Sequence, residues 1–270
     1  MNGLRKFVMY WKDIFSAQDP IKALGLSEYE RELGRFQIEV APEPFYGYFH
    51  EEESMSNDVL LLLLNPGAKD ERTNDKGWND SVKARYVNLW SKDEYLRQEE
   101  ILRKQNPWRD KRLNQTKGIV GDVEFLHTME FFPFHSKKDV LTENFKRKWV
   151  SDFQLADLTY HALKDIAVNR KVKQIFSVSN DWIRFFEKYG VPLEKEVILK
   201  KHKGKEYSFA FKMYRFSEGG LPILFCDLNG SPVNLPRNAF AVRVSQIMLG
   251  IVDESLPDFN SDFDIIIKKW

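Results

Sequence analysis

Four short segments combine side-chain amides or hydroxyls with residues that turn the chain. They are Asn65-Pro66-Gly67, Phe132 to Ser136, Ser179-Asn180-Asp181 and Asn229 to Pro232. Each follows a run of apolar residues. An asparagine in such a place either holds a loop against a ligand or closes a turn through its own backbone. Gly67 permits a positive φ angle or close approach of the backbone, which a ligand loop and a plain turn would both use.

The elements that must position these segments are predicted strands. They cover residues 58–65, 123–132, 172–180 and 221–229. Runs that are apolar on both faces are typical of parallel strands covered by helices. Helical patterns follow them at 81–105, 142–169, 181–190 and 236–254. The alternation predicts a parallel sheet in an α/β protein, whose ligands gather beyond the carboxyl ends of the strands. We therefore expect the four segments at one edge of one sheet.

The chain divides into three parts by pattern. Residues 1–55 end in an acidic stretch and are expected to form an N-terminal extension of helices or loops outside the sheet. Residues 56–254 are predicted to form the α/β domain. Alternating apolar and aromatic residues near 190–220 predict a hairpin inserted into that domain. Residues 255–270 are predicted to be a C-terminal tail.

The composition limits the partners of the protein. Forty-one basic and 40 acidic residues give a formal net charge of +1, so a nucleic acid would have to meet a local basic patch. Cys226 is the only cysteine, which excludes a disulfide framework or a cysteine-based zinc site and predicts a small core residue. The sequence shows neither a signal-peptide pattern nor the roughly 18 apolar residues of a membrane span. We expect a monomeric cytoplasmic protein that contacts no membrane.

The four strand ends, in this order, resemble the uracil-DNA glycosylase superfamily. The stretch "LLNPG" at 63–67 is similar to the first motif of the mismatch-specific branch, Gly-(Ile/Leu)-Asn-Pro-Gly, with Leu63 in the leading position. The stretch "LNGSPVNLPR" at 228–237 lies where the second motif, Asn-Pro-Ser-Gly, is expected. "MEFFPFHS" at 129–136 resembles the proline-containing loop beside the base pocket. The resemblance implies a three-layer α/β/α sandwich with a central parallel sheet.

The resemblance also implies a site. Asn65 would orient a water toward the sugar carbon of a flipped-out nucleotide, and Asp70 is an alternative catalytic acid. The substrate-binding candidates are Pro66, Gly67, Phe132, Phe134, His135, Ser136, Asn180, Asn229, Gly230, Ser231 and Arg237. The phenylalanines would offer a stacking face, His135 and Ser136 would wall the pocket, and Arg237 would grip a phosphate. Ordinary alternatives stay open, namely a turn for Asn65, core positions for the phenylalanines and a salt bridge for Arg237.

The function that follows is excision of a deaminated or mismatched base from DNA by hydrolysis of its N-glycosidic bond. Neither a glycine-rich phosphate loop nor a histidine-rich metal spacing is visible in the sequence, and we expect no cofactor. The alternative is a catalytically inactive member of the same fold that binds nucleic acid or a small nucleotide ligand.

Overall fold

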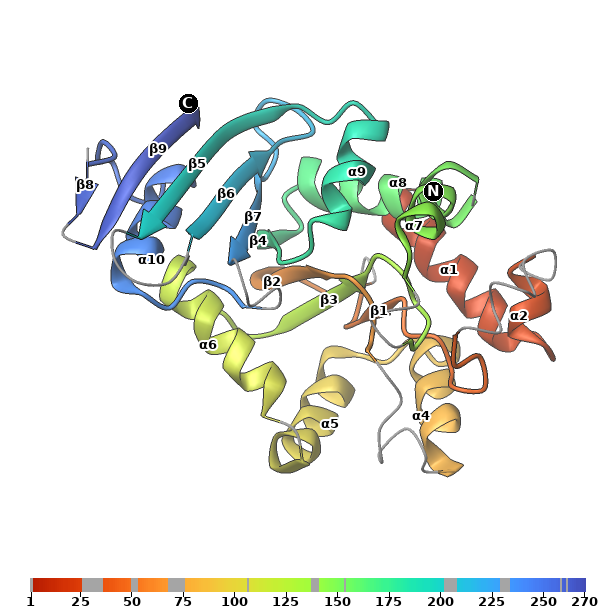
Figure 1. Ribbon diagram of the computed structural model, residues 1–270. Helices are drawn as coiled ribbons and strands as arrows, with labels where there is room; N and C mark the ends of the chain where they lie inside the picture. The colour runs from red at the N-terminus through yellow and green to blue at the C-terminus, as the bar shows by residue number, and fades with distance from the viewer. Residues whose placement is uncertain are drawn as a thin grey trace. The chain divides into compact units, whose positions relative to one another are not determined.

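The computed structural model describes residues 2–25, 36–49, 53–67, 76–105, 107–136, 141–152, 154–201, 208–228, 234–257, 259–260 and 262–270 (Figure 1). The described helices are α1 Gly3–Ser16, α2 Pro20–Ala23, α4 Lys76–Val87, α5 Lys92–Gln105, α6 Trp108–Val120, α7 Glu143–Asp152, α8 Gln154–Val168, α9 Asp181–Lys188 and α10 Ala239–Met248. The described strands are β1 Phe45–Tyr46, β2 Met55–Leu63, β3 Leu126–Glu130, β4 Val172–Ser177, β5 Leu193–Lys201, β6 Ser208–Tyr214, β7 Ile223–Leu228, β8 Phe259–Asn260 and β9 Phe263–Lys269.

The strands form one sheet in the order β1-β3-β2-β4-β7-β6-β5-β9-β8. The four predicted strands are confirmed as β2, β3, β4 and β7. The pairs β2–β4 and β4–β7 are parallel. The Val59 amide donates to the Phe125 carbonyl, and the Phe132 amide donates to the Leu64 carbonyl. These hydrogen bonds at the two ends of β3 show that β2 and β3 run in the same direction. The other half of the sheet is antiparallel, so the expectation of a parallel sheet is corrected to a mixed one.

The predicted hairpin near 190–220 contains β5 and β6, which pair antiparallel and lie within the sheet. Strand β6 pairs with β7 and β5 pairs with β9, both antiparallel, and Figure 1 shows these strands side by side. The segment 255–270 therefore supplies strands β8 and β9 to the sheet. The hairpin joins the sheet because β5 and β6 each bury one row of apolar side chains. Strand β9 joins it because the outer edge of β5 would otherwise leave its backbone groups without hydrogen bonds.

The chain forms two compact units, and their division differs from the one predicted. The first unit contains residues 1–53, 64–99 and 128–165, and the second contains 54–63, 100–127 and 166–270. Residues 1–53 thus belong to a unit together with two later segments. The predicted boundary at 254 falls inside the second unit.

In the second unit, helices pack on both faces of the sheet because successive strand residues point to opposite sides. On one face, Leu224 and Cys226 belong to a cluster with Leu113 of α6 and Val244 of α10. On the other face, the ring of Phe225 packs against Phe186 of α9, with centroids 5.5 Å apart. Helix α9 follows β4 as the sequence predicts, and Gly190 with φ of +63° lies just beyond its end.

In the first unit, aromatic side chains hold α1 against α4. The ring of Phe15 stacks on Tyr86, with centroids 4.3 Å apart, and the Tyr86 hydroxyl donates to the Phe45 carbonyl at 2.5 Å. Burial and the nearby Glu43 carboxylate hold the pKa of Tyr86 well above its ordinary value, so the phenol remains a donor. Helix α1 approaches α8 at Gly3, where an added Cβ would lie 2.1 Å from the His161 carbonyl oxygen.

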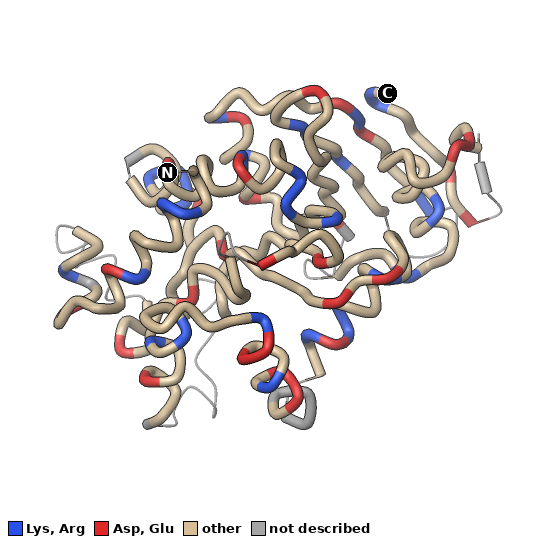
Figure 2. Tube along the Cα trace, turned by 180° about the vertical axis from the view of Figure 1, so that it is seen from behind, with Lys and Arg blue, Asp and Glu red and all other residues tan. Residues whose placement is uncertain are grey.

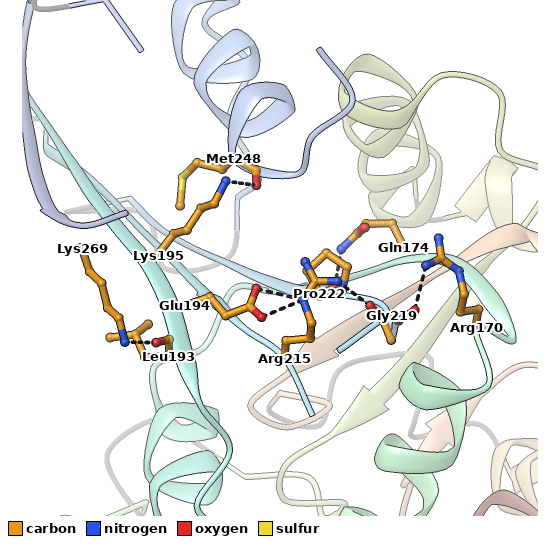
Figure 3. Close-up of polar contacts among 11 residues, drawn as sticks. Arg170, Gln174, Leu193, Glu194, Lys195, Arg215, Gly219, Pro222, Met248 and Lys269 are labelled. Carbon is orange, nitrogen blue, oxygen red and sulfur yellow. Dashed lines mark hydrogen bonds and ion pairs between the residues drawn. The ribbon is translucent and has the colours of Figure 1, made fainter. Parts of the chain in front are cut away.

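Polar contacts fasten the β5–β6 hairpin of the second unit (Figure 3). The Arg215 guanidinium donates to both carboxylate oxygens of Glu194, at 2.8 and 2.9 Å, and to the Gly220 carbonyl at 2.6 Å. Lys195 donates to the Met248 carbonyl at the end of α10 at 3.2 Å. Both contacts to Glu194 share the single Nε–H of Arg215, so they form one charge-assisted, three-centre hydrogen bond. Arg215 thus links β5 to the loop that follows β6.

The buried thiol of Cys226 provides a first testable prediction. Cys226 is 3% exposed within the core of the second unit, and burial raises the pKa of its thiol. Since only the thiolate is nucleophilic, we expect iodoacetamide to leave native protein unmodified near neutral pH and to label it fully in denaturant. The readout is intact mass over time. Rapid labelling of the native protein would contradict the placement of Cys226.

Candidate functional site

Asn65 lies just beyond β2, half-buried, with its amide nitrogen held by the loop that follows β3. Its Nδ2 donates to Ser136 Oγ at 2.7 Å and lies 3.5 Å from the carbonyl oxygens of Phe134 and Ser136. Carbonyl oxygens only accept, so these neighbours determine which way the amide is oriented. Its Oδ1 accepts no hydrogen bond from the described part of the chain. The side chain therefore keeps one acceptor for a water or a ligand donor.

The backbone of Gly67 completes this arrangement. The Ser136 amide donates to the Gly67 carbonyl at 2.9 Å, so the two loops are joined by both backbone and side chains. Gly67 has φ of +88°, and an added Cβ would meet nothing within 4 Å. The glycine is therefore needed for the left-handed backbone of the turn, and close packing is not the reason for it. Pro66 is half-buried between these residues.

The two phenylalanines of the second loop are core residues. Phe132 and Phe134 are 1% and 0% exposed. The ring of Phe132 packs against Phe36 and Trp149, with centroids 4.5 and 4.7 Å away. Neither ring has a face on which a base could stack, which corrects the expectation that they offer a stacking face and agrees with their alternative assignment to the core. The apolar run that predicted the strand is the same signal that buries these rings.

His135 is also buried, at 3% exposure, and was expected at a ligand. Its Nε2 lies 3.0 Å from Glu43 Oε1, and the other carboxylate oxygen lies 3.7 Å from Arg85 Nη1. The Arg85 guanidinium is covered by aromatic rings, including Tyr46 at 5.4 Å and Trp78 at 5.6 Å. Such cation–π contacts stabilise a desolvated cation. This buried polar group anchors the 133–136 loop, and in that way it supports the contact of Ser136 with Asn65.

In the second unit, Asn180 contacts a carboxylate that sequence reasoning missed. Asn180 is exposed after β4, and its Nδ2 donates to Asp227 Oδ2 at 2.7 Å. Asp227 lies near the end of β7, half-buried. Asn180 occupies the N-cap position of α9 but makes no side-chain capping bond there. The structure thus brings the ends of β4 and β7 together. A carboxylate two residues before Asn229 was the available sequence signal.

A second residue pair that the sequence did not reveal lies inside the sheet of the second unit. His127 Nε2 lies 3.1 Å from Asp58 Oδ2, and both side chains are 0% exposed. A carboxylate oxygen accepts, so the histidine nitrogen donates. Because solvent and substrate do not reach this pair, we assign it to stability.

Of the remaining predicted site residues, one is described by the structure and four are not. Arg237 lies exposed beside α6 in the second unit, where it lines a pocket. Asp70, Asn229, Gly230 and Ser231 lie outside the described residues. Within the described ranges, no group of three or more His, Cys, Asp or Glu side chains is placed to hold a metal ion. Figure 2 shows basic and acidic positions interspersed along the chain of each unit.

The fold and these contacts define a mixed α/β protein with polar side chains at several strand ends. No family model matches the chain, and neither does a curated protein or a solved structure. In the part of the chain that the structure describes, no helix combines the length and the apolar character that crossing a membrane requires.

Proposed function

We propose that the protein, acting as a monomer, binds DNA and hydrolyses the N-glycosidic bond of an extruded base that is deaminated or mismatched. The proposal rests on how the side-chain amide of Asn65 is held. Its Nδ2 is held at 2.7 Å by Ser136 Oγ, and its Oδ1 keeps an acceptor for a water. A base inside a duplex cannot be attacked, so the substrate would be a flipped-out nucleotide.

Two features support this proposal. The strand-end motifs resemble those of the uracil-DNA glycosylase superfamily, and β2, β4 and β7 run parallel in adjacent positions of the sheet. The loop that holds Asn65 is anchored by buried groups, which gives the rigidity that positioning a nucleophile requires.

A second candidate function is recognition of a base or nucleotide without hydrolysis. The observation that favours it is that the hydrogen-bonding partners of Asn65 in the described residues are neutral oxygens. No carboxylate among those residues activates the amide. An anchored amide with one remaining acceptor can read the amino group of a base by a direct hydrogen bond.

A lesion-cleavage assay tests the first function. We expect the protein to release a base from at least one of three labelled oligonucleotides, which contain uracil, hypoxanthine or a G·T mismatch. Abasic sites would be detected as strand breaks after alkali, in single-stranded and double-stranded forms. Binding to the same oligonucleotides, measured by fluorescence anisotropy, separates the two functions. Binding without cleavage would support recognition without hydrolysis. Absence of both binding and cleavage would refute both proposed functions.

A further inference from the structure

A pocket of about 540 Å³ lies in the second unit between α6 and the segment that leads into α10. Its α6 side includes Lys111, Asn114, Gln115 and Gly118, and its other side includes Pro236 and Arg237. A volume of this size falls within the roughly 300–1,000 Å³ range of small-molecule sites. Sequence reasoning placed Arg237 near a ligand but did not involve α6.

Gln115 is one of the residues that line this pocket, and its amide nitrogen is buried beneath the pocket surface. Its side chain is 7% exposed, and its Oε1 accepts from Arg112 Nη1 at 3.2 Å. A guanidinium can only donate, so the amide oxygen must face Arg112 and the amide nitrogen must face the other way. That nitrogen has no hydrogen-bond partner within the described part of the chain. A buried unsatisfied donor is costly, so a ligand acceptor that let this amide turn toward the pocket would relieve that cost.

Positive charge surrounds the same place. Arg112 is 4% exposed, its Nε has no partner among the described residues, and one face of its guanidinium lies 5.2 Å from the Trp108 ring. Burial and the charge of Arg237 lower the pKa of Arg112 to about 10, so it remains a cation at neutral pH. Lys111 adds an exposed ammonium and Asp110 a single carboxylate to the lining.

We propose that this pocket binds the phosphate group of a nucleotide, either free or within a nucleic acid. A phosphate would neutralise the charges of Arg237 and Lys111, and it would accept a hydrogen bond from the Gln115 amide once that side chain turned toward the pocket. Guanidinium groups match phosphate oxygens in pairs. The pocket is larger than a phosphate alone, and Asn114, Pro236 and Val242 give the rest of it the amide and apolar surface that a nucleoside can contact. This proposal does not depend on hydrolysis at Asn65.

The test is calorimetric titration at low salt with thymidine 5′-monophosphate, thymidine, inorganic phosphate and a single-stranded oligonucleotide. We expect binding of the monophosphate or the oligonucleotide, competition by inorganic phosphate and no binding of thymidine. Binding of the monophosphate identifies a free nucleotide as a sufficient ligand, whereas binding of the oligonucleotide alone identifies a phosphate within a nucleic acid. Absence of binding to all of them, or equal binding of thymidine and its monophosphate, would overturn the proposal.

Two matched pairs of variants locate the site. A Cβ at Gly118 would meet nothing within 4 Å, so Gly118→Glu and Gly118→Gln place equal bulk at the pocket and differ in charge. We expect Gly118→Glu to bind at least about tenfold more weakly than Gly118→Gln, the effect of losing about one charged hydrogen bond. Arg237→Gln should weaken binding by about tenfold, while Arg147→Gln on the exposed side of α7 should not. Equal affinities within both pairs would refute the location.

Discussion

Replacing Asn65 by alanine is expected to lower the rate of base excision by roughly 10²- to 10⁴-fold, the usual contribution of a group that positions and polarises a nucleophile. The substitution removes Oδ1, which we propose orients the water, while the loop keeps its backbone link between Ser136 and Gly67 at 2.9 Å. Folding and DNA binding should therefore be nearly unchanged. Single-turnover cleavage with wild type and variant in parallel gives the rate, and anisotropy gives the affinity.

Ser136→Ala is the matched positioning control for this experiment. It leaves the Asn65 amide in place but removes the 2.7 Å contact that anchors it. We expect a smaller loss in the cleavage rate than for Asn65→Ala, with unchanged oligonucleotide affinity, because a less rigid group positions water less well. Equal cleavage by wild type and Asn65→Ala would show that Asn65 is a turn residue, and the proposed hydrolysis would fail.

Replacing Asp58 by alanine is expected to destabilise the protein by about 3–5 kcal/mol, the cost of breaking a buried ion pair or charged hydrogen bond. The side chains of Asp58 and His127 are both fully buried and lie 3.1 Å apart. Without the carboxylate, the imidazole loses its acceptor and a cavity forms between β2 and β3. Since a domain is stable by roughly 5–15 kcal/mol, the fold would lose a large part of its stability.

Urea unfolding followed by circular dichroism measures this loss as a lower midpoint at constant slope. Asp253→Ala, at an exposed position, is the control and should change stability by about 0.5 kcal/mol or less. The variant with both Asp58 and His127 replaced by alanine should be more stable than the sum of the two single losses predicts, because each single change already removes their 3.1 Å contact. Additive losses would show that the two side chains do not interact.

The sequence by itself determined the elements that depend on local patterns. Apolar runs predicted β2, β3, β4 and β7, because a strand covered on both faces has no polar side to alternate. The alternation in 190–220 predicted the antiparallel pair β5 and β6, and the helical pattern at 181–190 predicted α9. The single cysteine in an apolar strand was correctly assigned to the core. Each of these inferences needs only the residues within one element.

Tertiary structure alone decided the pairings and the site contacts. The pair Asp58–His127 and the contact of Asn65 with Ser136 join residues 69 and 71 positions apart, and His135 and Glu43 are 92 apart. The pairing of β9 with β5 also joins distant parts of the chain. It places in the sheet a segment that was predicted to be a C-terminal tail. An apolar ring has the same sequence signature whether it lines a pocket or fills a core, and only the surrounding chain decides between them. For Phe132 and Phe134, that surrounding chain is the core of the first unit.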